Sequence, residues 1–152
     1  MLGTYRKLDT DGYPYRIVMT CGCFDILHIG HIRCLARAKE EGDLLVVGLN
    51  SDRSVRELKG PTRPIIPEYE RAEMLAYYSF VDYITTFDES SPSELMLEVR
   101  PDVFVKGGDW TVDALLKQDP ALNTIGAKIV IIPSVEGRST TKIVERVNNN
   151  GS

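Results

Sequence analysis

The chain has 152 residues, of which 43% are hydrophobic, and this is enough for one domain with a single buried core. Its formal net charge is −4 at pH 7, which argues against nucleic-acid binding because that affinity usually depends on a basic face. No apolar run approaches the roughly 20 residues of a membrane span, and no signal-peptide pattern opens the chain. The three cysteines have no disulfide-framework spacing. We therefore expect a cytoplasmic protein with neither nucleic-acid nor membrane partners.

The sequence predicts three segments. Residues 1–14 are polar, with Gly, Tyr and Pro, and form an N-terminal extension. Residues 15–147 carry the apolar runs of one domain, and residues 148–152 (NNNGS) read as a tail or linker remnant. This end composition is also expected of one domain of a larger fusion protein.

Strand-like and helix-like patterns alternate along the chain. Runs rich in β-branched residues predict buried strands, and apolar residues at helical spacing predict the helices between them. Such alternation indicates an α/β fold, a Rossmann-like doubly wound sheet of about five parallel strands with helices on both faces. Residues 110–126 are ambiguous and predict a helix interrupted near Pro120. In chain order, we expect strand 16–20, helix 29–41, strand 44–49, helix 67–78, strand 81–86, helix 93–99, strand 102–105, strand 128–132 and helix 140–147.

Polar, glycine-rich segments follow four of the predicted strands. Parallel sheets bind ligands at the carboxyl ends of their strands, so these segments should converge on one site. They are CGCFDILHIGH (21–31), NSDRSVRELKGPTRP (50–64), KGGDW (106–110) and PSVEGRSTTK (133–142).

The segment CGCFDILHIGH allows three interpretations. Cys21, Cys23, His28 and His31 could bind zinc, although structural zinc sites usually place their second ligand pair much further along the chain. The histidines could instead cap a helix without any chemistry. Alternatively, the two histidines lie on one face of a helix start, where free backbone N–H groups stabilise anions, and Gly22 and Gly30 would let a phosphate approach.

Cations and hydroxyls in the other segments favour the phosphate interpretation. A polyphosphate needs such groups and a zinc site needs none of them. The sequence has neither a P-loop nor a dinucleotide-binding turn, which argues against kinases and dehydrogenases. The candidate groups are Lys59, Arg63, Arg71, Lys106 with Gly107 and Gly108, and Arg138 with Ser139, Thr140 and Thr141.

The stretch GCFDILHIGH resembles the G-[TC]-F-D-x-x-H-x-G-H signature of the cytidylyltransferase-like nucleotidyltransferases, and STTKI (139–143) resembles their second signature. The resemblance runs over residues 17–147. Residues 50–75 and VKGGD (105–109) look most like the heptose-1-phosphate adenylyltransferase branch, whereas GGDW and EGRSTTKI are similar to glycerol-3-phosphate cytidylyltransferase. The general layout also resembles the cytidylyltransferase domain fused to phosphoenolpyruvate phosphomutase in fosfomycin biosynthesis.

This resemblance implies attack by an acceptor phosphate or phosphonate on the α-phosphorus of a nucleoside triphosphate. It implies Mg²⁺ carried by the triphosphate, no protein-bound zinc, and a homodimer as a common state. His28, His31, Lys59 and Thr140 are the expected catalytic residues. Gly22, Cys23, Phe24, Lys106, Gly107, Gly108, Asp109, Arg138, Ser139 and Thr141 are expected at the nucleotide, and Cys21, Asp25, Arg63 and Arg71 at the acceptor.

The donor and the acceptor are open at this stage. Cys21, Trp110, Arg138 and residues 110–126 depart from the heptose pattern, which argues against heptose as the acceptor. Trp110, STTKI and residues 110–126 lead us to favour CTP, with a small phosphate or phosphonate acceptor such as 2-hydroxyethylphosphonate. The alternative is an ATP-dependent adenylyltransferase for D-glycero-D-manno-heptose 1-phosphate. A second alternative is a non-catalytic nucleotide-binding module.

Overall fold

Five parallel strands form one sheet in the order β3-β2-β1-β4-β5 in the computed structural model, which describes residues 10–150. The central strand β1 pairs with both β2 and β4, so that Thr20 lies between Val47 and Val105. This topology confirms the predicted Rossmann-like α/β class. The strands are β1 (Ile17–Gly22), β2 (Leu44–Asn50), β3 (Tyr83–Phe87), β4 (Val103–Gly107) and β5 (Lys128–Ile132).

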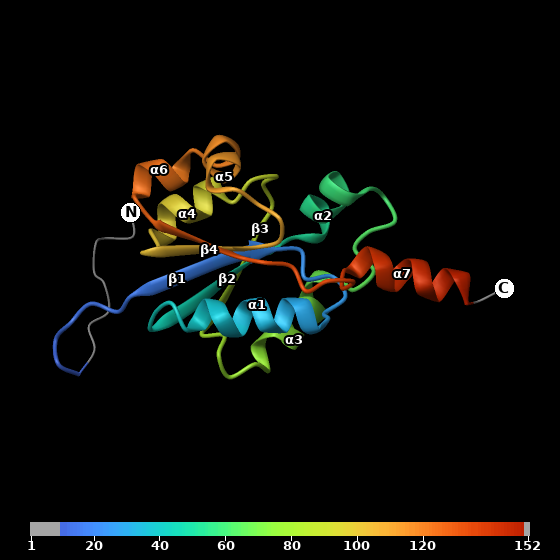
Figure 1. The fold of residues 1–152 in the computed structure, drawn as a ribbon, viewed down its shortest axis with the longest axis horizontal. Coiled ribbons are helices and arrows are strands. Elements are labelled where there is room, and N and C mark those ends of the chain that lie inside the picture. Colours follow the sequence, from blue (N-terminus) through green and yellow to red (C-terminus); the bar gives the residue numbers. More distant parts are fainter. Residues whose placement is uncertain (1–9, 151–152) are drawn as a thin grey trace.

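Helices cover both faces of the sheet (Figure 1). One face carries α1 (Ile29–Lys39) and α3 (Glu68–Ala76), and the other carries α4 (Ser93–Val99), α5 (Val112–Gln118) and α6 (Ala121–Ile125). Two further helices, α2 (Asp52–Lys59) and α7 (Thr140–Asn149), lie near the end of the sheet where the strands finish. Among residues 10–150, no helix combines the length and the apolar character needed to cross a membrane.

Two apolar cores lie on opposite faces of the sheet, because successive side chains of a strand point to opposite faces. Val18 on β1 packs with Leu35 of α1 and Leu75 of α3. Its neighbour Met19 packs on the other face, with Met96 of α4. The strands are thus buried on both sides, which explains why their sequences are apolar runs without clean alternation.

The stretch after Trp110 forms two helices, α5 and α6, with Pro120 between them, which confirms the predicted helix interrupted near Pro120. The structure differs from the sequence-based expectation in two places. Residues 52–59, expected as loop, form α2, because Ser51 caps its first turn and Gly60 ends it at a φ of 101°. Helix α7 continues to Asn149, into the segment predicted as a tail. Residues 1–9 of the predicted N-terminal extension, and 151–152 of the tail, lie outside the described residues.

Candidate functional site

The turn after β1 has an unusual backbone. Phe24 has a φ of 46°, a left-handed conformation that costs free energy for a residue with a side chain. Its ring is buried against Gly22, where an added Cβ would lie 3.1 Å from the ring. Gly22 therefore makes room for Phe24, and the turn leads directly into α1.

Two histidines stack at the start of α1. The ring centroids of His28 and His31 are 3.9 Å apart, and Phe24 lies 5.4 Å from His31. His28 is the N-cap of the helix, and its Nδ1 accepts a hydrogen bond from the backbone N–H of Gly30 at 3.1 Å. A side chain at residue 30 would collide with the His28 ring, because an added Cβ would lie 2.8 Å from its Cε1. The glycine of the signature is thus required by the packing of the ring.

Both histidines are held in the neutral form at pH 7. Burial, and then the neighbouring His28, lower the pKa of His31 to about 4. Burial, followed by the positive charge of Arg138, lowers the pKa of His28. Among the described residues, Nδ1 of His31 is a buried nitrogen without a hydrogen-bond partner. A neutral His28 that accepts at Nδ1 carries its proton on Nε2, so this nitrogen is the donor available to a ligand.

The beginning of α7 meets the same turn, as the sequence predicts. The Thr140 hydroxyl donates to the carbonyl of Ile26 at 3.2 Å. Ser139 caps α7 by accepting from the backbone N–H of Lys142. The Arg138 Cβ lies 3.9 Å from the position that a Cβ on Gly30 would occupy. The N-termini of α1 and α7, with their partial positive charge, are therefore brought together.

Lys59 and Arg63 reach this turn from the segment that follows β2. Burial raises the pKa of Cys23, and the charge of Lys59 is the largest influence that opposes this rise. The Nε of Arg63 donates to Asp25 at 2.6 Å. The loop between α2 and α3 is thereby tied to the signature turn.

The Asp25 carboxylate fixes this loop and is only 2% exposed. Besides Arg63, it accepts hydrogen bonds from the backbone N–H groups of Ile65 and Ile66, each at 2.9 Å. Burial raises the pKa of Asp25, but these backbone donors and Arg63 lower it by more. The pKa therefore lies below its usual value, and the group stays ionised. Because these bonds occupy its oxygens, Asp25 holds the loop in place. This argues against the predicted contact of Asp25 with the acceptor.

Two other residues assigned to the acceptor are buried away from it. Cys21 is 8% exposed and packs into the core beneath α4–α6, because it alternates with Thr20 along β1; burial raises its pKa to about 12. Arg71 on α3 is 0% exposed and bonds to backbone carbonyls and to Asp52. These placements correct the sequence-based assignment, which assumed that a thiol at a strand end and a helix arginine would face the site.

The segment after β4 borders the turn on its other side. An added Cβ at Gly107 would lie 2.9 Å from the Cys34 sulfur on α1, and the N–H of Gly108 donates to Ile132 of β5. Lys106 lies 5.3 Å above the Trp110 ring, which is half-buried against the α4–α6 core. The exposed Asp109 follows these glycines. All four sequence-predicted segments therefore lie at the carboxyl ends of the strands.

The zinc interpretation lacks a ligand set. Cys21 points into the core, while the two histidines stack at the helix start, so the four candidate ligands do not converge. Over residues 10–150, no three His, Cys, Asp or Glu side chains gather in a way that could hold a metal ion.

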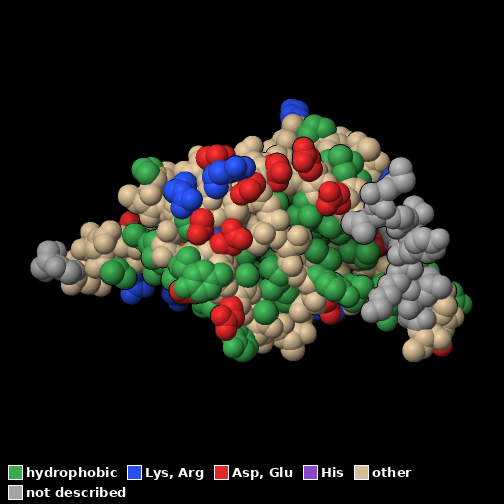
Figure 2. Space-filling model, turned by 180° about the vertical axis from the view of Figure 1, so that it is seen from behind, with side chains coloured by type: hydrophobic (Ala, Val, Ile, Leu, Met, Phe, Trp, Pro, Cys, Tyr) green, Lys and Arg blue, Asp and Glu red, His purple; other side chains and the backbone are tan. Residues whose placement is uncertain are grey.

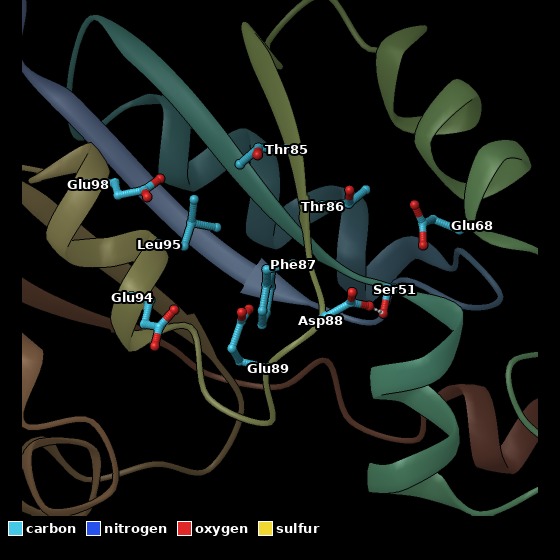
Figure 3. Close-up of a pocket in the computed structure, with 10 residues that line it drawn as sticks. All are labelled: Ser51, Glu68, Thr85, Thr86, Phe87, Asp88, Glu89, Glu94, Leu95 and Glu98. Carbon is cyan, nitrogen blue, oxygen red and sulfur yellow. Dashed lines mark hydrogen bonds between the residues drawn. The ribbon is translucent and has the colours of Figure 1, made fainter. Parts of the chain in front are cut away.

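A cavity of about 440 Å³ beside β3 has the opposite chemistry. Figure 3 shows it bordered by side chains from α3, β3 and α4, with the Ser51 hydroxyl bonded to Asp88. Figure 2 shows carboxylates gathered on the rear face of the molecule. Five carboxylates would repel a triphosphate, so this cavity is not the nucleotide site. They belong to Glu68, Asp88, Glu89, Glu94 and Glu98.

The N-termini of two helices meet at the histidine pair, an arrangement that suits the binding of phosphate groups. Residues 19–146 match the model of the cytidylyltransferase-like family, and the chain belongs to this family. Among its relatives is the bifunctional protein HldE of Syntrophotalea carbinolica, which is 51% identical over 86% of this chain and 26% of the relative. HldE of Koribacter versatilis is 53% identical over 86% of this chain and 27% of the relative. The chain thus spans about a quarter of the length of these proteins.

Solved structures agree with this assignment. A lipopolysaccharide core biosynthesis protein from Thermoplasma volcanium superposes with a TM-score of 0.66 at 31% identity, over 82% of this chain and 99% of that one. A pantothenate synthetase from Thermus thermophilus, at 17% identity and a TM-score of 0.56 over 78% of this chain and 56% of that one, shares the fold alone.

Proposed function

We propose that this chain is an adenylyltransferase that transfers AMP from ATP to a sugar 1-phosphate, D-glycero-D-manno-heptose 1-phosphate, and releases pyrophosphate. The observation that carries the proposal is the identity of 51% and 53% to two HldE proteins across 86% of the chain. It supports the resemblance of residues 50–75 and 105–109 to the heptose branch. The lipopolysaccharide-related solved structure adds to this support.

The relatives favour this ATP-dependent alternative over the CTP-dependent reaction that the sequence suggested. CTP and a phosphonate acceptor were inferred from Trp110, STTKI and residues 110–126. In the structure Trp110 packs against the α4–α6 core, so packing accounts for part of its burial. Trp110, one of the residues from which CTP was inferred, thus has a structural role in addition to any role in base selection.

The reaction requires alignment and charge neutralisation. An oxygen of the acceptor phosphate attacks the α-phosphorus while the bond between that phosphorus and the bridging oxygen of pyrophosphate breaks. A phosphate monoester is largely dianionic at neutral pH, because its second pKa is about 6, so no general base is needed. The site must instead stabilise the charge that grows on the phosphate oxygens in the transition state.

The histidine pair and the cations can supply this stabilisation. His28 has Nε2–H available, since its Nδ1 accepts from Gly30. The first backbone N–H groups of α7 have no intrahelical partners and lie beside Arg138, which suits them to the β- and γ-phosphates. Arg63 donates to Asp25 of the same turn, and we propose that the acceptor phosphate binds on the side of Lys59 and Arg63.

Magnesium fits this site only as a companion of the triphosphate. The carboxylate of the signature turn, Asp25, is already occupied by two backbone N–H groups and Arg63. We therefore place Mg²⁺ on triphosphate oxygens and water, where it would neutralise the leaving pyrophosphate.

Pyrophosphate release tests the proposal. ATP and CTP are each paired with D-glycero-D-manno-heptose 1-phosphate, glycerol 3-phosphate and 2-hydroxyethylphosphonate, with His28→Ala as the inactive control. We expect turnover with ATP and the heptose 1-phosphate. Turnover with CTP and the phosphonate would contradict the proposal. Tight ATP binding without turnover by any pair, unchanged in His28→Ala, would instead support a non-catalytic module.

A further inference from the structure

We propose that Arg71 is a positioning residue for the transfer reaction: it holds the signature turn and the Lys59-bearing helix in one geometry without touching the substrates. This inference rests on the proposed function. It concerns a buried arginine that the sequence had assigned to the acceptor.

Four of the five guanidinium N–H groups of Arg71 have partners from separate segments. Nη1 donates to the carbonyl of Cys23 at 2.5 Å and to that of Asn50 at 2.9 Å. Nε donates to the carbonyl of Ile66 at 2.9 Å, and Nη2 pairs with Asp52 at 2.8 Å. The planar guanidinium thus joins the signature turn, the end of β2, the start of α2 and the loop before α3.

The bond to Cys23 lies at the strained part of the turn. The carbonyl of Cys23 directly precedes Phe24, whose φ is 46°. Non-glycine residues keep such a conformation only when their surroundings impose it. Arg71 supplies one such constraint. The stacked histidines follow four and seven residues after Phe24, so a relaxed turn would displace their N–H donors.

The other bonds act on Lys59. Lys59 is the last residue of α2. Arg71 bonds to Asp52, the first residue of this helix, and to Ile66, in the segment that follows it. Asp25 connects the same loop to the turn by accepting hydrogen bonds from the N–H groups of Ile65 and Ile66. Arg71 and Asp25 therefore anchor the segments on either side of Lys59 to the signature turn.

Arg71→Lys tests this role, because lysine keeps the charge but cannot reproduce the planar fork. The matched control is Arg53→Lys on exposed α2, where Arg53 pairs with Glu57 and Asp88. Steady-state pyrophosphate release is measured well below each variant's melting midpoint. We expect kcat of Arg71→Lys to fall about 10- to 100-fold with little change in the acceptor KM, since small misplacements have effects of this size. Asp52→Asn leaves the bonds from Arg71 to the carbonyls in place, so its kcat should fall by less than that of Arg71→Lys.

A second readout does not depend on activity. In ¹H–¹⁵N spectra, we expect the amides of Phe24 and Gly30 to shift in Arg71→Lys and to stay in place in Arg53→Lys. A rise confined to the acceptor KM would overturn the proposal in favour of direct contact, and unchanged kcat with unmoved amides would leave Arg71 with stability alone. If the unmodified protein releases no pyrophosphate with any pair, the proposed function fails, while the amide shifts still decide the role of Arg71.

Discussion

Two regions at the same end of the sheet have opposite chemistry. The turn between β1 and α1 gathers His28, His31 and Arg138 beside the start of α7, whereas the cavity beside β3 is lined by carboxylates. Both lie at the carboxyl ends of strands, where ligands of this fold bind. The cavity beside β3 is therefore unsuited to a triphosphate, and the chemistry of the lining groups is a better guide to a phosphate site than concavity is.

Removal of a histidine donor should have the largest effect. We expect His28→Asn or His31→Ala to lower kcat by roughly 10²–10³, the usual loss for one transition-state donor. Asparagine is chosen at residue 28 because it is a good helix N-cap and can replace the bond to Gly30. The measurement is pyrophosphate release, with circular dichroism melting as the control for folding. An increase in the ATP KM with kcat unchanged would contradict a transition-state role.

Loss of the Lys59 charge should have the next largest effect. In Lys59→Met, we expect the ATP KM to rise and kcat to fall, each by about tenfold, the loss expected for about 1.4 kcal/mol of interaction with a phosphate. Arg56→Met is the matched control, because Arg56 is also exposed and also lies in the last turn of α2. Equal losses in the two variants would indicate a general effect of charge on α2 and would remove Lys59 from the site.

The half-buried histidine pair also makes stability depend on pH. The unfolded chain protonates His31 near pH 6.5, but the folded chain holds it neutral down to about pH 4. Between these values the unfolded state binds the additional proton, so the free energy of unfolding should decrease as pH falls through this window. Urea denaturation at several pH values would measure the slope, and His31→Gln should reduce it. An unchanged slope in that variant would mean that other groups cause the dependence.

The sequence predicted the sheet well and the buried charges poorly. Five apolar runs and the Gly-rich segments after them were sufficient to predict a parallel sheet with one ligand edge. Helix α2 was missed because its sequence has few apolar residues, so Val55 contributes most of the buried periodic signal. Arg71 was misassigned because its partners are carbonyls of distant segments, and a single sequence does not reveal such contacts. Asn50, which ends β2, and Asp52, which begins α2, were overlooked for the same reason.

The smallest effect is expected in the acidic cavity, where we predict that a double substitution, Glu94→Gln with Glu98→Gln, leaves kcat unchanged. Exposed charges are screened beyond about 8 Å at physiological ionic strength, so these carboxylates should exert only a weak long-range repulsion on ATP. The ATP KM should decrease slightly in the variant, and the decrease should grow as salt is lowered, because the repulsion then reaches further. A large loss of kcat would show instead that the cavity takes part in the reaction. Catalytic residues would then lie in both the cationic and the acidic half of the sheet edge.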